Sequence, residues 1–161
     1  MHLPYDPKTD LEIDRVIMAA PSTIWRCWTE PELLKQWFCP KPVEMEEVRL
    51  DPRPGGAFYA RMRTPSGKTV ETDGCILVFK PDNMLVFTDA LAPGFHPRKR
   101  SFLTTVVLLS PEVLGTRYII RALHADEESN KAHENMGFHQ GWGQSTDQLE
   151  DLAKSLRQPR M

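Results

Sequence analysis

A few polar side chains are candidates for chemistry in an otherwise apolar interior. His124 ends a predicted strand just before a long helix, and strand alternation points its ring inward. Glu134 and Asn135 fall in the inward sector of that helix. Asp89 shares the strand parity of Phe87. Structural hydrogen bonding, orientation of a ligand and proton transfer all stay open as roles for these groups.

His133, Glu134 and His139 raise the possibility of a metal site, but their spacing argues against one. Histidines that bind zinc from a single helix usually converge at i,i+4 spacing, as in H-E-x-x-H. Here the offset is i,i+6, which turns the two rings about 120° apart at roughly 100° per residue. We therefore expect no metal ligands, and we interpret His133 and His139 as surface or edge residues.

Other catalytic classes lack their sequence patterns. There is no G-x-S-x-G elbow for a nucleophile, and no P-loop or G-x-G-x-x-G for a nucleotide. No cofactor is therefore expected. Cys27, Cys39 and Cys75 have no reactive context, and we interpret them as small apolar residues in a reducing cytoplasm.

The helix predicted over residues 126–156 contains Gly137, Gly141 and Gly143. Each glycine costs about 1 kcal/mol relative to alanine inside a helix, so a compensating reason is needed. One stripe of this helix carries Phe138, Trp142, Ser145, Leu149, Leu152 and Leu156. Its C-terminal half is typical of core packing, whereas its N-terminal half sets aromatic rings beside a missing side chain. The pattern favours a helix that packs at one end and covers a pocket at the other.

The elements before this helix predict a curved antiparallel sheet. Residues 11–19 indicate a strand, residues 21–28 a short helix, and a capping-box pattern at 29–32 starts a second short helix. Six strands follow between residues 43 and 123, separated by clusters of turn residues. A single sheet with one apolar face, closed by one amphipathic helix, is the simplest α+β arrangement that buries both surfaces.

Two hairpins allow the strand register to be predicted. In the first, Arg61 faces Glu71 and Tyr59 faces Asp73, which separates a charged face from an apolar face. In the last, four pairs are self-consistent: Leu109–Tyr118, Val107–Ile120, Thr105–Ala122 and Leu103–His124.

Bulk properties exclude several classes of function. The 161 residues suit a single domain over 1–161, with its core at about 11–156. A net charge of −2 gives no footprint for nucleic acid, and we interpret the basic run at 98–100 as a solvated loop tip. No apolar run approaches the roughly 20 residues of a membrane span, and no signal pattern opens the chain, so we expect a cytoplasmic protein.

Five segments, in this order, resemble the helix-grip domains of the START and polyketide-cyclase superfamily. Within it they are similar to the branch named for the activator of heat-shock-protein-90 ATPase. The segments are IDRVIMAAPSTIWRCWTEPELLKQWF, RPGGAF, LVFTDAL, GTRYIIRALHADEE and HENMGFHQGWGQSTDQLEDL. The resemblance implies a helix-grip fold: about seven strands in the order β-α-α-β6-α, wrapped around the C-terminal helix with an apolar cavity between. Members of the superfamily bind lipids, sterols, polyketides or plant hormones, and a few catalyse ring closure.

Three functions are therefore considered. The first is binding of a small hydrophobic or amphipathic molecule in the cavity, which we favour over catalysis. The second is a cyclase- or dehydratase-type enzyme using His124 with Asp89 or Glu134. The third is a chaperone-associated interaction module. A homodimer is plausible for a small domain of this kind, although no sequence feature requires one. The expected ligand-binding residues are Trp37, Phe58, Met62, Phe87, Asp89, Tyr118, His124, Glu134, Phe138 and Trp142.

Overall fold

The computed structural model describes residues 3–156. The strands of its main sheet are β1 (Asp10–Ile17), β2 (Glu44–Leu50), β3 (Ala57–Arg63), β4 (Thr69–Lys80), β5 (Met84–Thr88), β8 (Thr104–Glu112) and β9 (Gly115–Leu123). They form a seven-stranded antiparallel sheet in the order β1-β9-β8-β5-β4-β3-β2. The short strands β6 (Leu91–Ala92) and β7 (His96–Pro97) form a separate hairpin.

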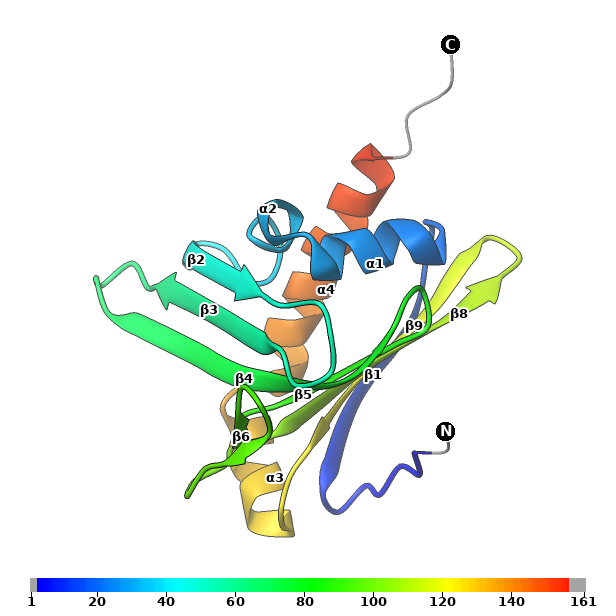
Figure 1. Ribbon diagram of the computed structural model, residues 1–161. Coiled ribbons are helices and arrows are strands. Elements are labelled where there is room, and N and C mark those ends of the chain that lie inside the picture. Colours follow the sequence, from blue (N-terminus) through cyan, green and yellow to red (C-terminus); the bar gives the residue numbers. More distant parts are fainter. Residues whose placement is uncertain (1–2, 157–161) are drawn as a thin grey trace.

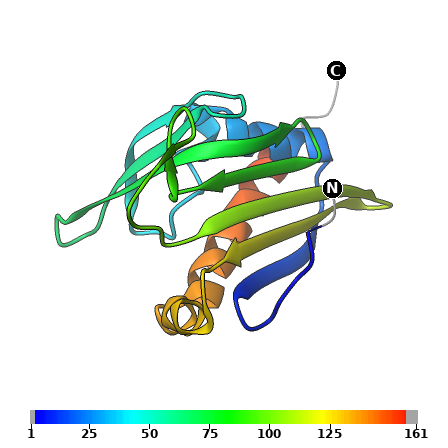
Figure 2. The same cartoon turned by 60° about the horizontal axis from the view of Figure 1, so that its bottom comes forward.

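Four helices accompany the sheet. They are α1 (Pro21–Thr29), α2 (Pro31–Leu34), α3 (Glu127–Asn135) and α4 (Phe138–Ser155). The sheet curves around α4, with α1 and α2 beside the C-terminal half of α4 and α3 at its opposite end (Figures 1 and 2). The predicted α+β fold, with its curved seven-stranded sheet and C-terminal helix, is confirmed.

The hairpin registers follow the predicted alternation. Arg61 pairs with Glu71 and Tyr59 with Asp73 between β3 and β4. The first three pairs predicted between β8 and β9 are also present. Pairing between these two strands ends at Thr104 and Leu123, so the fourth predicted pair lies just beyond the ladder. Because a slip of one residue would expose the whole apolar face, the register is strongly determined.

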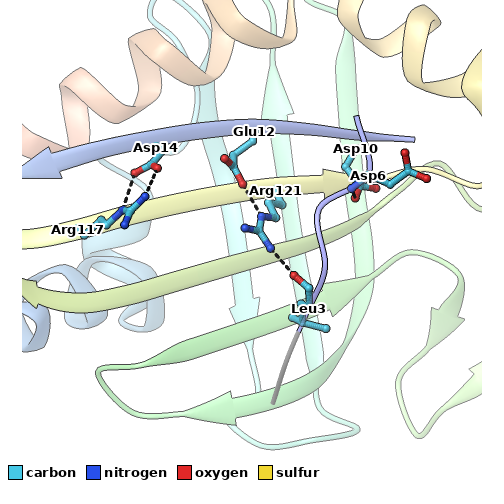
Figure 3. A network of polar contacts seen from close by, with 7 residues as sticks. All are labelled: Leu3, Asp6, Asp10, Glu12, Asp14, Arg117 and Arg121. Atoms are coloured by element: carbon cyan, nitrogen blue, oxygen red, sulfur yellow. Dashed lines mark hydrogen bonds and ion pairs between the residues drawn. The ribbon is translucent and has the colours of Figure 1, made fainter. Parts of the chain in front are cut away.

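Charged side chains join β1 to β9 on the face that points away from α4 (Figure 3). The Arg121 guanidinium contacts the Glu12 carboxylate and donates to the Leu3 carbonyl at 2.6 Å. Arg117 pairs with Asp14 at 2.6 Å. These contacts tie edge strand β1 and the segment before it to β9.

The prediction of one continuous C-terminal helix is wrong at Gly137. Helix α3 ends at Asn135, and Gly137 adopts a left-handed conformation (φ +96°) immediately before α4 begins. Its amide donates to the Glu134 carbonyl at 3.0 Å, which closes the end of α3. Glycine occupies this conformation at little cost, so it ends the helix here.

The helix break at Gly137 changes the orientation of the α3 side chains relative to α4. The predicted inward orientation of Glu134 and Asn135 is wrong, because both side chains are exposed. The interpretation of His133 as a surface or edge residue is also wrong, since it is 8% exposed. The predicted stripe holds from Phe138 onward: Phe138, Ser145 and Leu149 are buried.

The start of α2 also differs from its prediction. The predicted capping box is not formed, because Glu30 is the N-cap and makes no side-chain capping hydrogen bond. The hydroxyl of Thr29 instead donates to the Trp25 carbonyl at 2.7 Å, as the last residue of α1. The proline in the first turn, Pro31, is present as expected.

The interior is solid where the C-terminal half of α4 meets α1 and the sheet. We call this region the packed end, and its fully buried side chains include Ile17, Ile24, Trp28, Tyr118, Leu149 and Ala153. Trp28 lies at its centre and donates through Nε1 to the Tyr118 hydroxyl at 3.1 Å. A buried indole N–H needs such a partner, so this bond belongs to the core.

The cysteines lie inside the molecule as free thiols. Cys27, Cys39 and Cys75 are all buried. Burial raises the pKa of Cys27 to about 11 and that of Cys39 to about 12. Thiols that stay protonated are inert, which agrees with their interpretation as apolar residues.

Within residues 3–156, none of the helices combines the length and apolar character that a bilayer crossing requires.

Candidate functional site

A cavity of about 720 Å³ lies between the sheet and the N-terminal half of α4. We call this part of the interior the open end. Its walls come from β3, β4 and β5, from the α3–α4 junction, from residues 38–40 and from the loop that contains residues 98–103. This volume falls within the range of roughly 300–1,000 Å³ typical of small-molecule sites.

Aromatic rings form one side of the cavity and are supported from behind. Phe87 lines the cavity and stacks on Phe58, with centroids 4.0 Å apart and planes 7° from parallel. Trp142 lines it from α4 and lies nearly parallel to Trp28, at 6.3 Å and 15°. Trp28 and Phe58 therefore fix the lining rings from within the packed core.

The polar side chains of α4 hold the wall made by residues 38–40. The Ser145 hydroxyl donates to the Phe38 carbonyl at 3.0 Å. The Gln148 amide donates to the carbonyls of Trp37 (2.9 Å) and Cys39 (2.8 Å), and its oxygen accepts from the Lys41 amide at 3.0 Å. Ser145 therefore belongs in the apolar stripe because its hydroxyl satisfies the Phe38 carbonyl.

The glycines differ in their relation to the cavity. Gly137 and Gly141 line it, whereas Gly143 does not. A Cβ added at Gly141 would meet only Pro40 Cγ at 4.0 Å, and one added at Gly143 would meet nothing within 4 Å. The predicted void beside the glycines therefore lies at Gly137 and Gly141.

Asp89 lies at the cavity, but its carboxylate is committed to the neighbouring loop. It accepts hydrogen bonds from the Ser101 hydroxyl at 3.1 Å, the Phe102 amide at 2.9 Å and the Leu103 amide at 3.2 Å. These bonds hold the loop so that Phe102 and Leu103 line the cavity.

The basic run borders the cavity, and its interpretation as a solvated loop tip holds only in part: Lys99 and Arg100 are exposed as predicted, whereas Arg98 is partly buried. Arg98 donates to the Asp73 carbonyl at 2.6 Å and lies 3.0 Å from the Asp73 carboxylate. This pairing ties the run to β4 and places Arg98 and Arg100 among the lining residues. Asp73 is far from Arg98 along the chain, so local sequence gave no signal for the contact.

Two histidines form a hydrogen-bonded pair at the α3 side of the cavity. His124 Nδ1 lies 2.8 Å from the Thr9 carbonyl, and His124 Nε2 lies 2.8 Å from His133 Nδ1. His133 lines the cavity, with its ring centroid 4.6 Å from that of Phe102 and 5.2 Å from that of Phe138. Desolvation by burial, followed by the charge of His124, lowers the pKa of His133 to about 4.

The ten expected ligand-binding residues fall into three groups. Those at the cavity surface are Met62, Phe87, Asp89, Phe138 and Trp142. Those that are buried but do not line the cavity are Trp37, Phe58, Tyr118 and His124. Glu134 lies outside the cavity, exposed beside a second pocket of about 280 Å³.

The acid–base group expected for an enzyme is not assembled. His124 is bonded to Thr9 and His133, and no hydrogen bond or ion pair in residues 3–156 joins it to Asp89 or Glu134. The same part of the chain contains no cluster of three or more His, Cys, Asp and Glu side chains arranged for a metal ion. The polar groups present are suited to orienting a bound molecule.

Sequence reasoning missed His133, residues 38–40 and the loop at 98–103. For His133 a signal existed: Gly137 follows the helical run that ends at Asn135, and glycine is enriched just after helix ends. The other two segments are positioned by Gln148, Asp73 and Asp89, which are distant in sequence.

The curved sheet closed by α4, with a cavity between them, defines a helix-grip protein of the START and polyketide-cyclase-like class. The family model described as "Activator of Hsp90 ATPase homolog 1-like protein" matches residues 18–154, and the chain belongs to this family. The predicted membership is thereby confirmed.

Solved structures agree with this assignment. A Nitrosomonas europaea protein is 40% identical, covers 95% of this chain and 99% of its own, and superposes with a TM-score of 0.92. Proteins from Rhodobacter sphaeroides (21% identity, 93% and 95% covered, TM-score 0.81) and Mycobacterium smegmatis (23% identity, 98% and 99% covered, TM-score 0.79) share the fold. No curated protein matches the chain.

Proposed function

We propose that this protein binds a small hydrophobic or amphipathic molecule in the cavity between the sheet and α4. The observation that carries the proposal is the 720 Å³ space lined by Phe87, Phe138 and Trp142. Protein interiors are normally packed to crystal-like density, and side chains that border a void lose dispersion contacts. A ligand would restore those contacts and bury the apolar lining.

The distribution of polar groups supports an amphipathic ligand. Arg98, Arg100, Glu71 and Asp73 lie along the cavity together with its apolar residues. Arg98 is paired with Asp73, whereas no hydrogen bond or ion pair in residues 3–156 engages the Arg100 side chain, which is exposed. Arg100 is therefore available to a polar end of the ligand, while the rings contact its apolar part.

The proposal is tested by filling the cavity from α4. A broad panel of fatty acids, sterols and aromatic polyketides is screened by thermal melting, because a ligand that binds only the folded state raises the melting temperature. Gly141→Leu places a branched side chain at the cavity wall beside Pro40. We expect it to weaken binding of each hit at least tenfold.

Gly143→Leu is the matched control. It makes the same change two residues further along α4, where a side chain meets open space outside the cavity. This variant should bind as the unmodified chain does. The proposal fails if no panel member shifts the melting temperature, or if both leucine variants lose affinity equally.

No observation in the described residues favours the acid–base enzyme or the chaperone-associated module over binding. The enzyme required His124 beside Asp89 or Glu134. His124 is instead bonded to His133, Asp89 to the Phe102 amide, and Glu134 lies at the second pocket. The basic run considered for a chaperone contact is held at the cavity through Arg98.

A further inference from the structure

The bonds of the histidine pair determine which nitrogens carry hydrogen. The Thr9 carbonyl can only accept, so His124 Nδ1 donates to it. In the neutral ring, His124 Nε2 then holds a lone pair and accepts from His133 Nδ1 across the 2.8 Å contact. It follows that the remaining nitrogen of neutral His133, Nε2, also carries a lone pair.

This nitrogen has no donor of its own within residues 3–156. His133 as a residue is 8% exposed, and its ring lies at the cavity against Phe102 and Phe138, which have no polar side-chain atoms. No carboxylate in the described part of the chain lies within ion-pair distance of either histidine. Burial also lowers the pKa of His133, so the ring is neutral at neutral pH.

We propose that His133 Nε2 accepts a hydrogen bond from the ligand, so that the cavity selects apolar molecules carrying a hydroxyl or N–H donor. This inference rests on the proposed function and names the class of ligand for the same cavity. His124 is a positioning residue: through its bond to Thr9 it sets the tautomer of His133. The pair ends at a carbonyl that cannot take up a proton, so it orients a donor instead of passing a proton onward.

The first test needs no ligand. Nitrogen-15 NMR of the imidazole rings distinguishes protonated from unprotonated ring nitrogens. At neutral pH we expect His133 to show a protonated Nδ1 and an unprotonated Nε2. A spectrum with hydrogen on Nε2 would overturn the inference and leave the proposed function standing.

The second test compares 2-naphthol with its methyl ether, 2-methoxynaphthalene, in which a methyl group replaces the donor hydrogen. Affinities are measured by calorimetry. We expect 2-naphthol to bind about tenfold more tightly, because one net hydrogen bond contributes roughly that factor. His133→Asn keeps an amide donor toward His124. Its oxygen, the one acceptor left, then overlays ring atom Cδ2 and does not reach the position of Nε2, so the ratio should fall toward one.

His139→Asn is the control, since His139 is an exposed histidine in the first turn of α4 and does not line this cavity. Its preference for 2-naphthol should equal that of the unmodified chain. Equal affinity of the unmodified chain for the two probes would overturn the inference and leave the proposed function standing. A preference for 2-naphthol that survives in His133→Asn would do the same. Failure of both probes to bind would count against the inference and the proposed function together.

Discussion

The two ends of α4 perform different tasks within one helix. Around Leu149 and Ala153 the interior is filled, and both side chains are fully buried against α1 and the sheet. Around Gly141 and Trp142 the same helix borders a cavity of about 720 Å³. Because apolar burial dominates folding free energy, the packed end supplies the stability that lets the open end remain hollow.

The polar groups of the two ends differ in the same way. At the packed end, the Tyr118 hydroxyl and the Trp28 indole satisfy each other, and burial raises the pKa of Tyr118. At the open end, Nδ1 is the one His133 ring nitrogen with a hydrogen-bond partner in residues 3–156. A closed polar pair belongs to a core, whereas a half-satisfied group beside a cavity is available to a ligand.

The largest expected effect is at the packed end. Leu149→Ala removes a fully buried side chain and leaves a void, so the free energy of unfolding should fall by about 3–4 kcal/mol. Urea denaturation measures the change. Leu152→Ala, at a partly buried position of the same helix, should cost less. The ligand affinity of the folded Leu149→Ala protein should be unchanged. If Leu149→Ala lowered the free energy of unfolding by less than about 1 kcal/mol, the proposed difference between the packed end and the open end would be contradicted.

The next effect is the pH dependence of the open end. The pKa of His133 is about 4 in the folded state and about 6.5 when unfolded. The unfolded chain therefore binds more protons between these values, so stability falls as pH drops from 6.5 toward 4. The groups around the ring are His124, Phe102 and Phe138, and none of them offers a carboxylate.

The size of this effect follows from the shift. Each pKa unit corresponds to about 1.4 kcal/mol, and contact with the solvent-accessible cavity reduces the full value, so we expect a loss of about 2 kcal/mol. Denaturation curves at several pH values, compared between the unmodified chain and His133→Asn, isolate this contribution from that of the carboxylates. Parallel pH profiles for the two proteins would show that His133 titrates normally.

The sheet and the C-terminal part of α4 were predictable from the sequence because their periodicity is tied to burial. In the β3–β4 hairpin, a register shifted by one residue would have turned Phe58 and Met62 outward. In α4, Phe138, Ser145 and Leu149 repeat at helical spacing over several turns. Distance from the cavity was not predictable: Trp37 and Tyr118 are buried as expected, but the spacing of apolar residues does not say whether a buried side chain reaches the cavity surface.

The errors around the cavity have two physical origins, a helix break and a set of long-range contacts. Gly137 was compatible both with the interior of a long helix and with its end. Its place after a helical run favoured the end, and its left-handed φ establishes it. Counting 100° per residue across this break misplaced His133 and Glu134 together. The loop with Arg98 could not be placed, because its anchors Asp73 and Asp89 are set by sheet geometry and not by local sequence.

The smallest predicted effect compares two glycines inside α4. Gly141→Ala and Gly143→Ala should each raise the free energy of unfolding by up to about 1 kcal/mol, since alanine restricts the unfolded chain and favours helix. Neither methyl group meets an obstacle: the nearest atom to the Gly141 position is Pro40 Cγ at 4.0 Å, an ordinary contact. Only Gly141→Ala adds volume at the cavity wall, so ligand affinity should change there and not in Gly143→Ala. Urea denaturation measures the free energy of unfolding, and calorimetry with the same ligand measures the affinity. If Gly141→Ala were less stable than the unmodified chain, the wall beside Pro40 would have no room for a methyl group. The contrast between the packed end and the open end would then be smaller than we infer.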